Sequence, residues 1–446
     1  MDLLIRRAAY LLHDADRFER DADLLIEGNR IAAIGHNLLA PPGAEIMDAR
    51  GCAVIPGLVN AHTHLYQNLL KGVEAGLRLV PWCDAVLFPM VDVILQERRA
   101  GNRRTAYLWS ALGALEMIRA GTTCCQDLDM SANAIFQAWT DVGLRGVGAI
   151  TMADAWIPAD VMTESDRLKQ SLLKYVDRWH DPAGRVTISL GPSTPFLCSA
   201  GLLEWIRDVS EARDLGIHIH VSETAGEVAD ALRDWGMRPV KYLESLGLLS
   251  ERLSAVHCVH VDGTEIELLT RHGVTVVHCP KSNMKLADGV MDWPALQAAG
   301  VEVALGNDGC ASNDLLDMWE EMRAAALLAS VTADDPAVLT PADVFRAATE
   351  GGARACRVDS GTLDLDRLAD IAIVDLSAPH LRPLHDILQT LVYCARAGDV
   401  RDTIIDGQVV MRQRRIVTVD EAALVEEADA VGQELYARAQ RSTVRR

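Results

Sequence analysis

The segment AVIPGLVNAHTH, residues 53–64, is an almost uninterrupted apolar run that ends in two histidines. A short apolar run of this kind predicts a strand buried on both faces, as in a parallel sheet. Side chains at positions i and i+2 of a strand point to the same side, so His62 and His64 can converge on one ion. An isolated pair of this kind is also consistent with two polar residues at a strand end. Other residues of the sequence are therefore needed to distinguish a metal site from this alternative.

Further apolar runs of similar length follow, separated by longer stretches with helical periodicity. They are GTTCCQDL (121–128), RGVGAITM (145–152), VTISLGPS (186–193), GIHIHVSE (216–223), LSAVHCVH (253–260), GVTVVHCP (273–280) and VEVALGNDG (301–309). With the run AVIPGLVNA (53–61) they make eight candidate strands. Strand–helix alternation over about 300 residues predicts an α/β fold, a closed parallel (β/α)8 barrel of the TIM type. We place this barrel at residues 57–360.

The two ends of the chain share a different pattern of short strands and turns. ADLLIEGNRIAAIG (22–35) predicts a hairpin that turns at Glu27, Gly28 and Asn29, and the strands LADIAIVDL (368–376) and DTIIDGQVVM (402–411) follow the barrel, the latter turning at Asp406-Gly407. Neither end could bury an apolar face alone. We therefore expect residues 1–56 and 361–420 to form one small β-sandwich domain, and residues 421–446 to form a charged amphipathic C-terminal helix.

Composition excludes several classes of partner. The formal net charge of −20 disfavours nucleic acid and anionic membranes, which both attract basic surfaces. We expect a cytoplasmic protein, because no apolar run reaches the length of a signal peptide or a membrane span. Ten cysteines in 446 residues are too dilute for a disulfide framework and fit a reducing compartment.

Reactive side chains gather at the predicted strand ends, where the active sites of such barrels lie. His220 ends the fifth strand and Asp308 ends the eighth, opposite His62 and His64 in the ring. Three imidazoles and one carboxylate suit one divalent metal ion, with zinc as the first choice and iron(II) as the alternative. The fourth strand, VTISLGPS, lacks the lysine that commonly bridges two metals, so we predict a mononuclear site. His218 lies deeper on the same strand face as His220, and we interpret it as a hydrogen-bonded core histidine.

Several motifs together resemble the amidohydrolase superfamily, and within it the methylthioadenosine and S-adenosylhomocysteine deaminases and the triazine hydrolases of the atrazine chlorohydrolase type. They are PGLVNAHTHLYQNLLKG (56–72), HIHVSET (218–224), AVHCVH (255–260), HCPKSNMKLADGV (278–290) and ALGNDGCASNDLLDMWEEMR (304–323). The resemblance covers essentially the whole chain. It implies a hydrolase with His62, His64, His220 and Asp308 as metal ligands, and relatives of this kind are often homo-oligomers.

The resemblance also implies the proton-transfer residues. Glu223 matches the acid of the family's HxxE pair, and His257 matches the histidine beside the attacking water. Asp308 can take a proton from that water, and Glu223 can protonate a ring nitrogen and then the departing amine. We therefore expect a metal-dependent deaminase of an N-heteroaromatic amine, such as an aminopurine or an adenosine derivative. A triazine-type hydrolase that releases chloride or an alkylamine, a pterin or guanine deaminase, and a scaffold without catalysis are the alternatives.

The substrate pocket departs from the nucleoside deaminases at several positions. Ser193 stands where many relatives have a histidine, Asp84 where we expect a glutamate that holds ribose hydroxyls, and Ile150 or its neighbours where an arginine is often found. Loss of these polar groups should weaken the binding of a ribose or an amino-acid tail. The side chains that can line a flatter apolar pocket are Trp82, Phe88, Trp156 and Phe196. Ser312 and Asn313 can contact substrate, or can serve as loop hydrogen-bonding residues.

Overall fold

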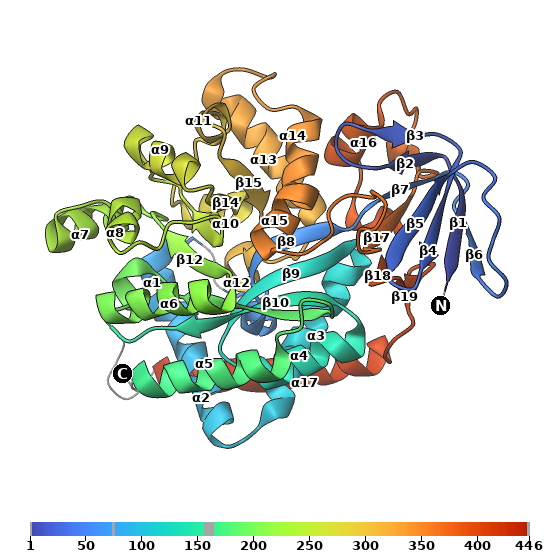
Figure 1. The fold of residues 1–446 in the computed structure, drawn as a ribbon. Helices are drawn as coiled ribbons and strands as arrows, with labels where there is room; N and C mark the ends of the chain where they lie inside the picture. The colour runs from blue at the N-terminus through green and yellow to red at the C-terminus, as the bar shows by residue number, and fades with distance from the viewer. Residues whose placement is uncertain (1, 74–75, 156–164, 444–446) are drawn as a thin grey trace.

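The computed structural model describes residues 2–73, 76–155 and 165–443. Its largest sheet has nine parallel strands in the order β15-β14-β13-β12-β11-β10-β9-β8-β16 (Figure 1). The bounds of these strands are β8 Leu58–His64, β9 Thr122–Asp129, β10 Arg145–Met152, β11 Val186–Pro192, β12 Ile217–Val221, β13 Leu253–His257, β14 Thr275–His278, β15 Glu302–Leu305 and β16 Asp308–Gly309.

The two ends of this sheet are neighbours in the sequence. Leu305 at the end of β15 pairs with β14, whereas Asp308 in β16 pairs with Thr63 of β8, and only residues 306 and 307 lie between them. The sheet therefore returns to its first strand, and the mixed α/β fold fits the predicted TIM-type barrel.

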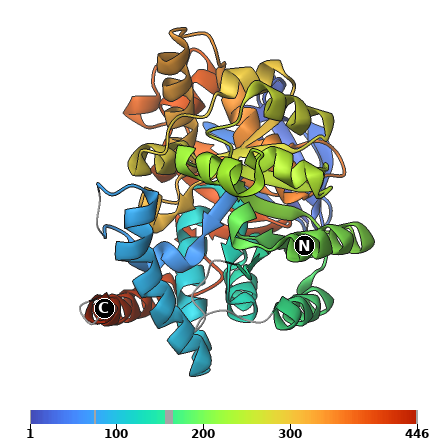
Figure 2. The same cartoon turned by 90° about the vertical axis from the view of Figure 1, so that its left-hand side faces the viewer.

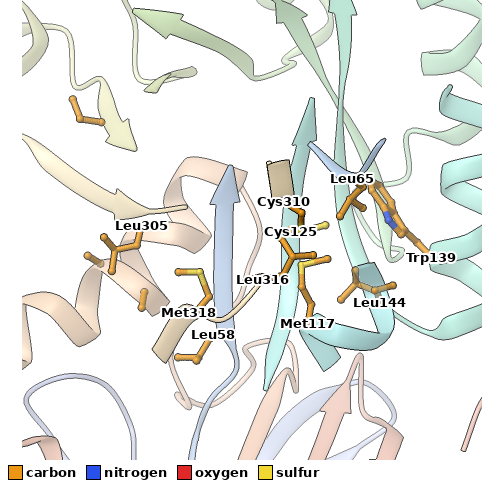
Figure 3. Packing of buried hydrophobic residues seen from close by; sticks show 14 of the residues in the cluster. Leu58, Leu65, Met117, Cys125, Trp139, Leu144, Leu305, Cys310, Leu316 and Met318 are labelled. Atoms are coloured by element: carbon orange, nitrogen blue, oxygen red, sulfur yellow. The ribbon is translucent and has the colours of Figure 1, made fainter. Parts of the chain in front are cut away.

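Helices follow the strands and lie around the sheet (Figures 1 and 2). The longer ones are α3 Arg103–Arg119, α4 Ala132–Val142, α5 Ser165–Trp179, α6 Ala200–Arg213, α7 Ala225–Trp235, α9 Gly263–Arg271 and α13 Met318–Ala333, and the shorter ones are α8 Pro239–Ser245, α10 Pro280–Leu286, α11 Trp293–Ala298, α12 Cys310–Asn313, α14 Pro341–Arg346, α15 Gly352–Cys356 and α16 Ile387–Tyr393. Their apolar faces join the strands in one large core, which includes Leu58 of β8, Cys125 of β9 and Met117 of α3 (Figure 3).

The prediction of a single strand at residues 53–61 is wrong, because the structure divides this run into two strands. β7 (Cys52–Pro56) pairs with strands outside the barrel, and β8 begins after Gly57. A Cβ atom at Gly57 would lie 2.1 Å from the side chain of Thr123, so only a glycine lets the chain pass this close to β9. The apolar run therefore continues through a change of sheet.

The remaining strands form two sheets built from both ends of the chain, with orders β5-β4-β1-β6 and β20-β19-β18-β17-β7-β2-β3. Their bounds are β1 Leu3–Ala8, β2 Tyr10–Leu12, β3 Phe18–Glu19, β4 Ala22–Glu27, β5 Arg30–Gly35, β6 Glu45–Asp48, β17 Ile371–Asp375, β18 Val400–Ile405, β19 Gln408–Arg412 and β20 Arg415–Ile416. One apolar cluster contains residues of both sheets. The two predicted hairpin turns are confirmed, because Glu27 pairs with Arg30 and Ile405 pairs with Gln408.

The predicted C-terminal helix is α17 (Glu421–Thr443), which packs along α3 and α2 (Phe88–Arg99). Within the described residues, the helical segment Leu79–Arg99 has the length of a membrane span and contains an 18-residue window with a mean hydropathy of 1.5, contrary to the expectation from the sequence. It consists of α1 (Leu79–Trp82), a π-helical turn η2 (Cys83–Leu87) and α2. A single segment of this kind is weak evidence for a membrane, because core helices pass the same test.

A buried ion pair links the barrel to the seven-stranded sheet. The guanidinium of Arg145, at the start of β10, donates to both carboxylate oxygens of Asp370, over 2.6 and 3.1 Å, and both side chains are almost fully buried. Arg145 also contacts Asp406 in the β18–β19 turn. Removing one partner of such a pair leaves a buried charge without compensation.

We therefore expect Arg145→Met to lower the free energy of unfolding by about 3–5 kcal/mol. Chemical denaturation followed by circular dichroism measures the change. Arg213→Met is the control, because its ion pair with Asp177 is exposed and should contribute about 1 kcal/mol or less. Equal effects of the two substitutions would contradict a special role for the Arg145–Asp370 pair.

Candidate active site

The four predicted metal ligands lie together at the carboxyl ends of the strands. His62 Nε2 and His64 Nε2 are 3.3 and 3.4 Å from Asp308 Oδ1, and His64 Nε2 is 3.2 Å from His220 Nε2. A tetrahedral ion with bonds of about 2.0–2.1 Å sets its ligand atoms roughly 3.3–3.4 Å apart. These three spacings therefore fit ligands that share one divalent metal ion.

A chain of buried hydrogen bonds orients the ring of His62. Ser254 Oγ donates to the carbonyl oxygen of Ile217, so it accepts from His218 Nδ1 at 2.6 Å. The Nε2 atom of His218 then accepts from His62 Nδ1 at 2.8 Å. His62 Nε2 has no hydrogen-bond partner, is buried and turns its lone pair to the centre of the site. His218 is thus the hydrogen-bonded core histidine we predicted, but it also positions a ligand, which the sequence analysis missed.

Backbone carbonyl groups orient the other two ligand histidines. His64 Nδ1 donates to the carbonyl oxygen of Leu128 at 2.9 Å, and His220 Nδ1 donates to that of Ser193 at 2.6 Å. Because a neutral imidazole carries only one N–H, the Nε2 atoms of both rings keep a free lone pair. All three histidines therefore present an acceptor nitrogen to the same point.

The charge states of the site suit a cation. Burial lowers the pKa of His64 to about 4 and holds the pKa of His220 well below its usual value, so both rings are neutral at neutral pH. Burial alone would raise the pKa of Asp308, but the polar side chains of His62, His64 and His257 around it outweigh burial and keep this pKa well below its usual value. Neutral imidazoles beside an ionised carboxylate are the ligands that a divalent metal prefers, so the residues present fit such an ion.

The carboxylate of Asp308 is fixed by residues on both sides of it. Ser282 Oγ and Ser312 Oγ donate to Oδ2 at 2.6 and 3.3 Å, and the backbone N–H of Gly309 donates to Oδ1. Asn313 Nδ2 donates to the buried carboxylate of Glu321. Ser312 Oγ and Asn313 Nδ2 thus bond within the protein and hold the β16 turn, whereas Asn313 Oδ1 is buried without a partner. Contact of these two residues with substrate stays a prediction.

Glu223 lies in a sharp turn between β12 and α7. The backbone N–H groups of Ser222 and Glu223 donate to the side chain of Glu227, at 2.9 and 2.8 Å. This turn brings Glu223 Oε1 to 3.6 Å from His257 Nε2. Burial, and then the nearby charges of Asp308 and Asp288, raise the pKa of Glu223 well above its usual value. A carboxyl group with a raised pKa therefore lies beside the metal ligands, as an acid catalyst requires.

His257 lies closer to the ligand atoms than the sequence analysis indicated. Its ring stacks on that of His220, with centroids 5.4 Å apart, and it belongs to a second possible ligand group with His62 and Asp308. Burial lowers the pKa of His257 to about 3, so this ring is neutral too. The position of His257 is therefore compatible with a ligand as well as with a hydrogen-bonding partner of the attacking water.

The predicted substrate residues Trp82 and Asp84 differ in exposure. Trp82 is only 4% exposed, with an indole N–H that has no partner, whereas Asp84 is exposed to solvent. Cys83 between them is half-buried, and burial, and then the charges of Glu223, Asp84 and Asp308, raise its pKa to about 12.

The other predicted pocket residues differ in their exposure to solvent. Ser193 is half-buried beside the β11 end, and its carbonyl group holds His220. Phe88 and Phe196 are 50% and 40% exposed, so neither is enclosed in a pocket. Ile150 is buried within β10. Trp156 lies outside the described residues.

Comparisons with known proteins agree with this geometry. The model of the amidohydrolase family matches residues 53–410. The 5'-deoxyadenosine deaminase of Methanothermobacter thermautotrophicus is 39% identical over 93% of this chain and 95% of its own. The 5-methylthioadenosine/S-adenosylhomocysteine deaminase of Thermococcus kodakarensis is 40% identical over 87% of this chain and 89% of its own.

Two solved structures share the fold. An adenosine deaminase from Xanthomonas campestris with bound zinc superposes with a TM-score of 0.91 and is 34% identical over 98% of both chains. The atrazine chlorohydrolase of Arthrobacter aurescens TC1, also with zinc, has a TM-score of 0.91 and 26% identity over 96% of this chain and 100% of its own. The strand-end histidines, the aspartate of the closing strand and the family match over most of the sequence lead to one conclusion: the chain belongs to the amidohydrolase family.

Proposed function

We propose that this protein is a metal-dependent hydrolytic deaminase of an N-heteroaromatic amine, and that its substrate is an adenosine derivative of the methylthioadenosine or S-adenosylhomocysteine kind. The observation that carries the proposal is the buried Glu223 carboxyl group, which has a raised pKa and lies 3.6 Å from His257. The deaminase relatives at 36–40% identity support the substrate class.

His62, His64, His220 and Asp308 would hold one divalent ion, zinc in the first place and iron(II) as the alternative. Zinc is supported by the two zinc-bound structures of the same fold. Such an ion lowers the pKa of a bound water from near 16 to roughly 7 and so supplies hydroxide at neutral pH.

The residues of the chain then move the protons. Asp308 takes a proton from the attacking water, and His257 holds that water through Nε2. Attack at the carbon that bears the amino group places negative charge on a ring nitrogen, which Glu223 neutralises by donating its proton. The proton that Asp308 took from the water then passes through Glu223 to the departing amine. The ring amine and water thus yield an oxo-substituted ring and ammonia.

A second candidate keeps these residues and changes the leaving group to chloride or an alkylamine, as in the triazine hydrolases; a pterin or guanine deaminase is a further variant. Ser193 at the mouth and the exposed position of Asp84 favour a pocket with few polar groups for a ribose. The buried indole of Trp82 adds apolar surface that suits a flat ring.

We also propose the wider organisation. Residues 57–360 form a closed (β/α)8 barrel, residues 1–56 and 361–420 form one β-sandwich, and residues 421–446 make up the C-terminal helix, of which 444–446 lie outside the described residues. The shared apolar cluster of the two small sheets supports the sandwich. We place the protein in the cytoplasm, as a homo-oligomer that acts on a small molecule and binds neither nucleic acid nor membrane.

Removal of one ligand should abolish metal binding. We expect His220→Ala to lower the zinc content from about one ion per chain to a small fraction of that, because the substitution removes one of the three imidazole ligands. Elemental analysis of the purified protein measures it. His380→Ala is the control, because its ring pairs with Asp399 at the surface and should leave the zinc content unchanged. Full zinc retention in His220→Ala would contradict the ligand set.

Loss of the acid should affect turnover and not metal binding. We expect Glu223→Gln to lower kcat by about 10²–10⁴-fold, because the amide cannot protonate the ring nitrogen. Steady-state kinetics and zinc analysis together separate the two effects. Glu204→Gln, on the exposed face of α6, serves as the matched control. Near-normal kcat in Glu223→Gln would reject Glu223 as the acid.

A product assay should identify the leaving group. Zinc-loaded protein should release ammonia from at least one member of a panel of adenosine derivatives, aminopurines, pterins and aminotriazines. Chloride or alkylamine release from substituted triazines, without ammonia release from any panel member, would favour the second candidate. A zinc-replete protein that acts on none of these compounds would contradict both.

A further inference from the structure

Helix α13 carries a carboxylate that lies behind the β16 turn. The side chain of Glu321 is fully buried. Asn307 Nδ2 and Asn313 Nδ2 donate to its Oε1 atom over 3.3 and 2.5 Å. The backbone N–H of Lys281 donates to Oε2 over 3.3 Å. Burial of a carboxylate costs free energy unless donors compensate it, so its place between these three donors calls for a reason other than packing.

The three donors belong to the two segments that hold Asp308. Lys281 directly precedes Ser282, whose Oγ donates to Asp308 Oδ2 at 2.6 Å. Asn313 directly follows Ser312, whose Oγ donates to the same oxygen at 3.3 Å. The third donor is the residue directly before Asp308. Glu321 thus bonds to the chain neighbours of both serines and of the carboxylate that these serines hold.

A further bond fixes the direction of these contacts. Asn313 Nδ2 also donates to the backbone carbonyl oxygen of Asn307 at 2.6 Å. Because a carbonyl oxygen only accepts, the amide nitrogen of Asn313 must lie on this side, where Glu321 also lies. The backbone N–H of Lys281 can only donate, so both oxygens of Glu321 act as acceptors. A carboxylate accepts at both oxygens, whereas a glutamine would present a donor at one of the two positions.

The backbone at Asp308 depends on contacts of this kind. Asp308 has φ of +61°, in the left-handed region that residues other than glycine adopt infrequently. Such a conformation persists where the surrounding contacts determine it. Because the two serines hold Oδ2, the other oxygen, Oδ1, faces His62 Nε2 and His64 Nε2 at 3.3 and 3.4 Å.

We propose that Glu321 is a positioning residue that determines which oxygen of Asp308 faces the metal position. It holds the segments that carry Ser282 and Ser312, and these serines bind Oδ2 and leave Oδ1 for the ion. None of the three donors to Glu321 is itself a predicted ligand, so Glu321 acts through their neighbours. The inference rests on the proposed function, because it assigns Glu321 a role toward the proposed metal ion.

Zinc affinity tests this role without a substrate. Glu321→Gln keeps the shape of the side chain but places an amide N–H against one of the three donors. We expect the zinc dissociation constant to rise by about 10–100-fold, because residues behind metal ligands commonly have effects of this size. Competition with a chromophoric chelator measures the constant. A zinc dissociation constant equal to that of the unmodified protein would overturn the proposal.

Cobalt substitution separates the alignment of Asp308 from general stability. The visible absorption bands of bound Co(II) depend on ligand geometry, so Glu321→Gln should alter them. The matched control is Asp402→Asn, which changes a buried carboxylate of the seven-stranded sheet that accepts from Arg401 and from the backbone N–H of Gln413. It should leave the zinc dissociation constant and the cobalt bands unchanged. Equal changes in both variants would assign the effect to lost stability and reject the proposal.

A double-mutant cycle tests the route through the serines. Ser282→Ala/Ser312→Ala removes both side-chain bonds to Asp308 Oδ2. In this background we expect Glu321→Gln to change the zinc dissociation constant by about threefold or less, because the bonds that transmit its effect are already absent. The same fold-change in both backgrounds would contradict this route.

A second variant covers the case in which Glu321→Gln does not fold. Asn313→Ala removes the shortest contact of Glu321 and should raise the zinc dissociation constant in the same direction. If the unmodified protein binds no zinc, the proposed function and this inference are rejected together. If the unmodified protein binds zinc and these variants bind it equally tightly, this inference alone is rejected.

Discussion

The site depends on the way in which the barrel closes. The last strand stops at Leu305, and the chain resumes as β16 against β8, so that Asp308 pairs with Thr63 between the two histidines of the first strand. Gly306 permits this passage, because a Cβ atom there would lie 2.8–3.0 Å from atoms of His62. The backbone N–H of Asn307 donates to the side-chain oxygen of Asn60, and Thr63 Oγ1 donates to the carbonyl oxygen of Asp308. These two bonds hold the segment between β15 and β16 against β8.

Burial then shifts the pKa values of the side chains at this site. Imidazoles that are shielded from water stay neutral, whereas the carboxylate of Asp308 stays ionised because hydrogen-bond donors surround it. Burial, and then the charges of Asp308 and Asp288, raise the pKa of Glu223 well above its usual value. The pKa values of two carboxyl groups at one strand edge are thus shifted in opposite directions, as hydrolytic deamination requires of its base and its acid.

Hydrogen-bond direction determines which nitrogen of each ligand histidine faces the metal position. The rings of His62, His64 and His220 each have an acceptor behind Nδ1, so each presents a lone pair at Nε2. These acceptors lie on other strands or directly after them: His218 in β12, Leu128 in β9 and Ser193 after β11. Partners behind a metal site commonly tune it in this way. The order of the strands in the sheet therefore determines which hydrogen-bond partners orient the ligand histidines.

The sequence by itself determined most of the strand positions, the two hairpin turns, the C-terminal helix and the side chains that meet at the strand ends, because these follow from local periodicity and from the alternation of side chains along a strand. It could not reveal the change of sheet at Gly57, since the apolar run continues through it, or the break between β15 and β16. Nor could it reveal that His218 positions His62. Those facts depend on contacts between residues far apart in the chain, and the direction of each hydrogen bond is set only when both partners are in place. Tertiary structure alone decides which lone pairs and protons the assembled side chains present.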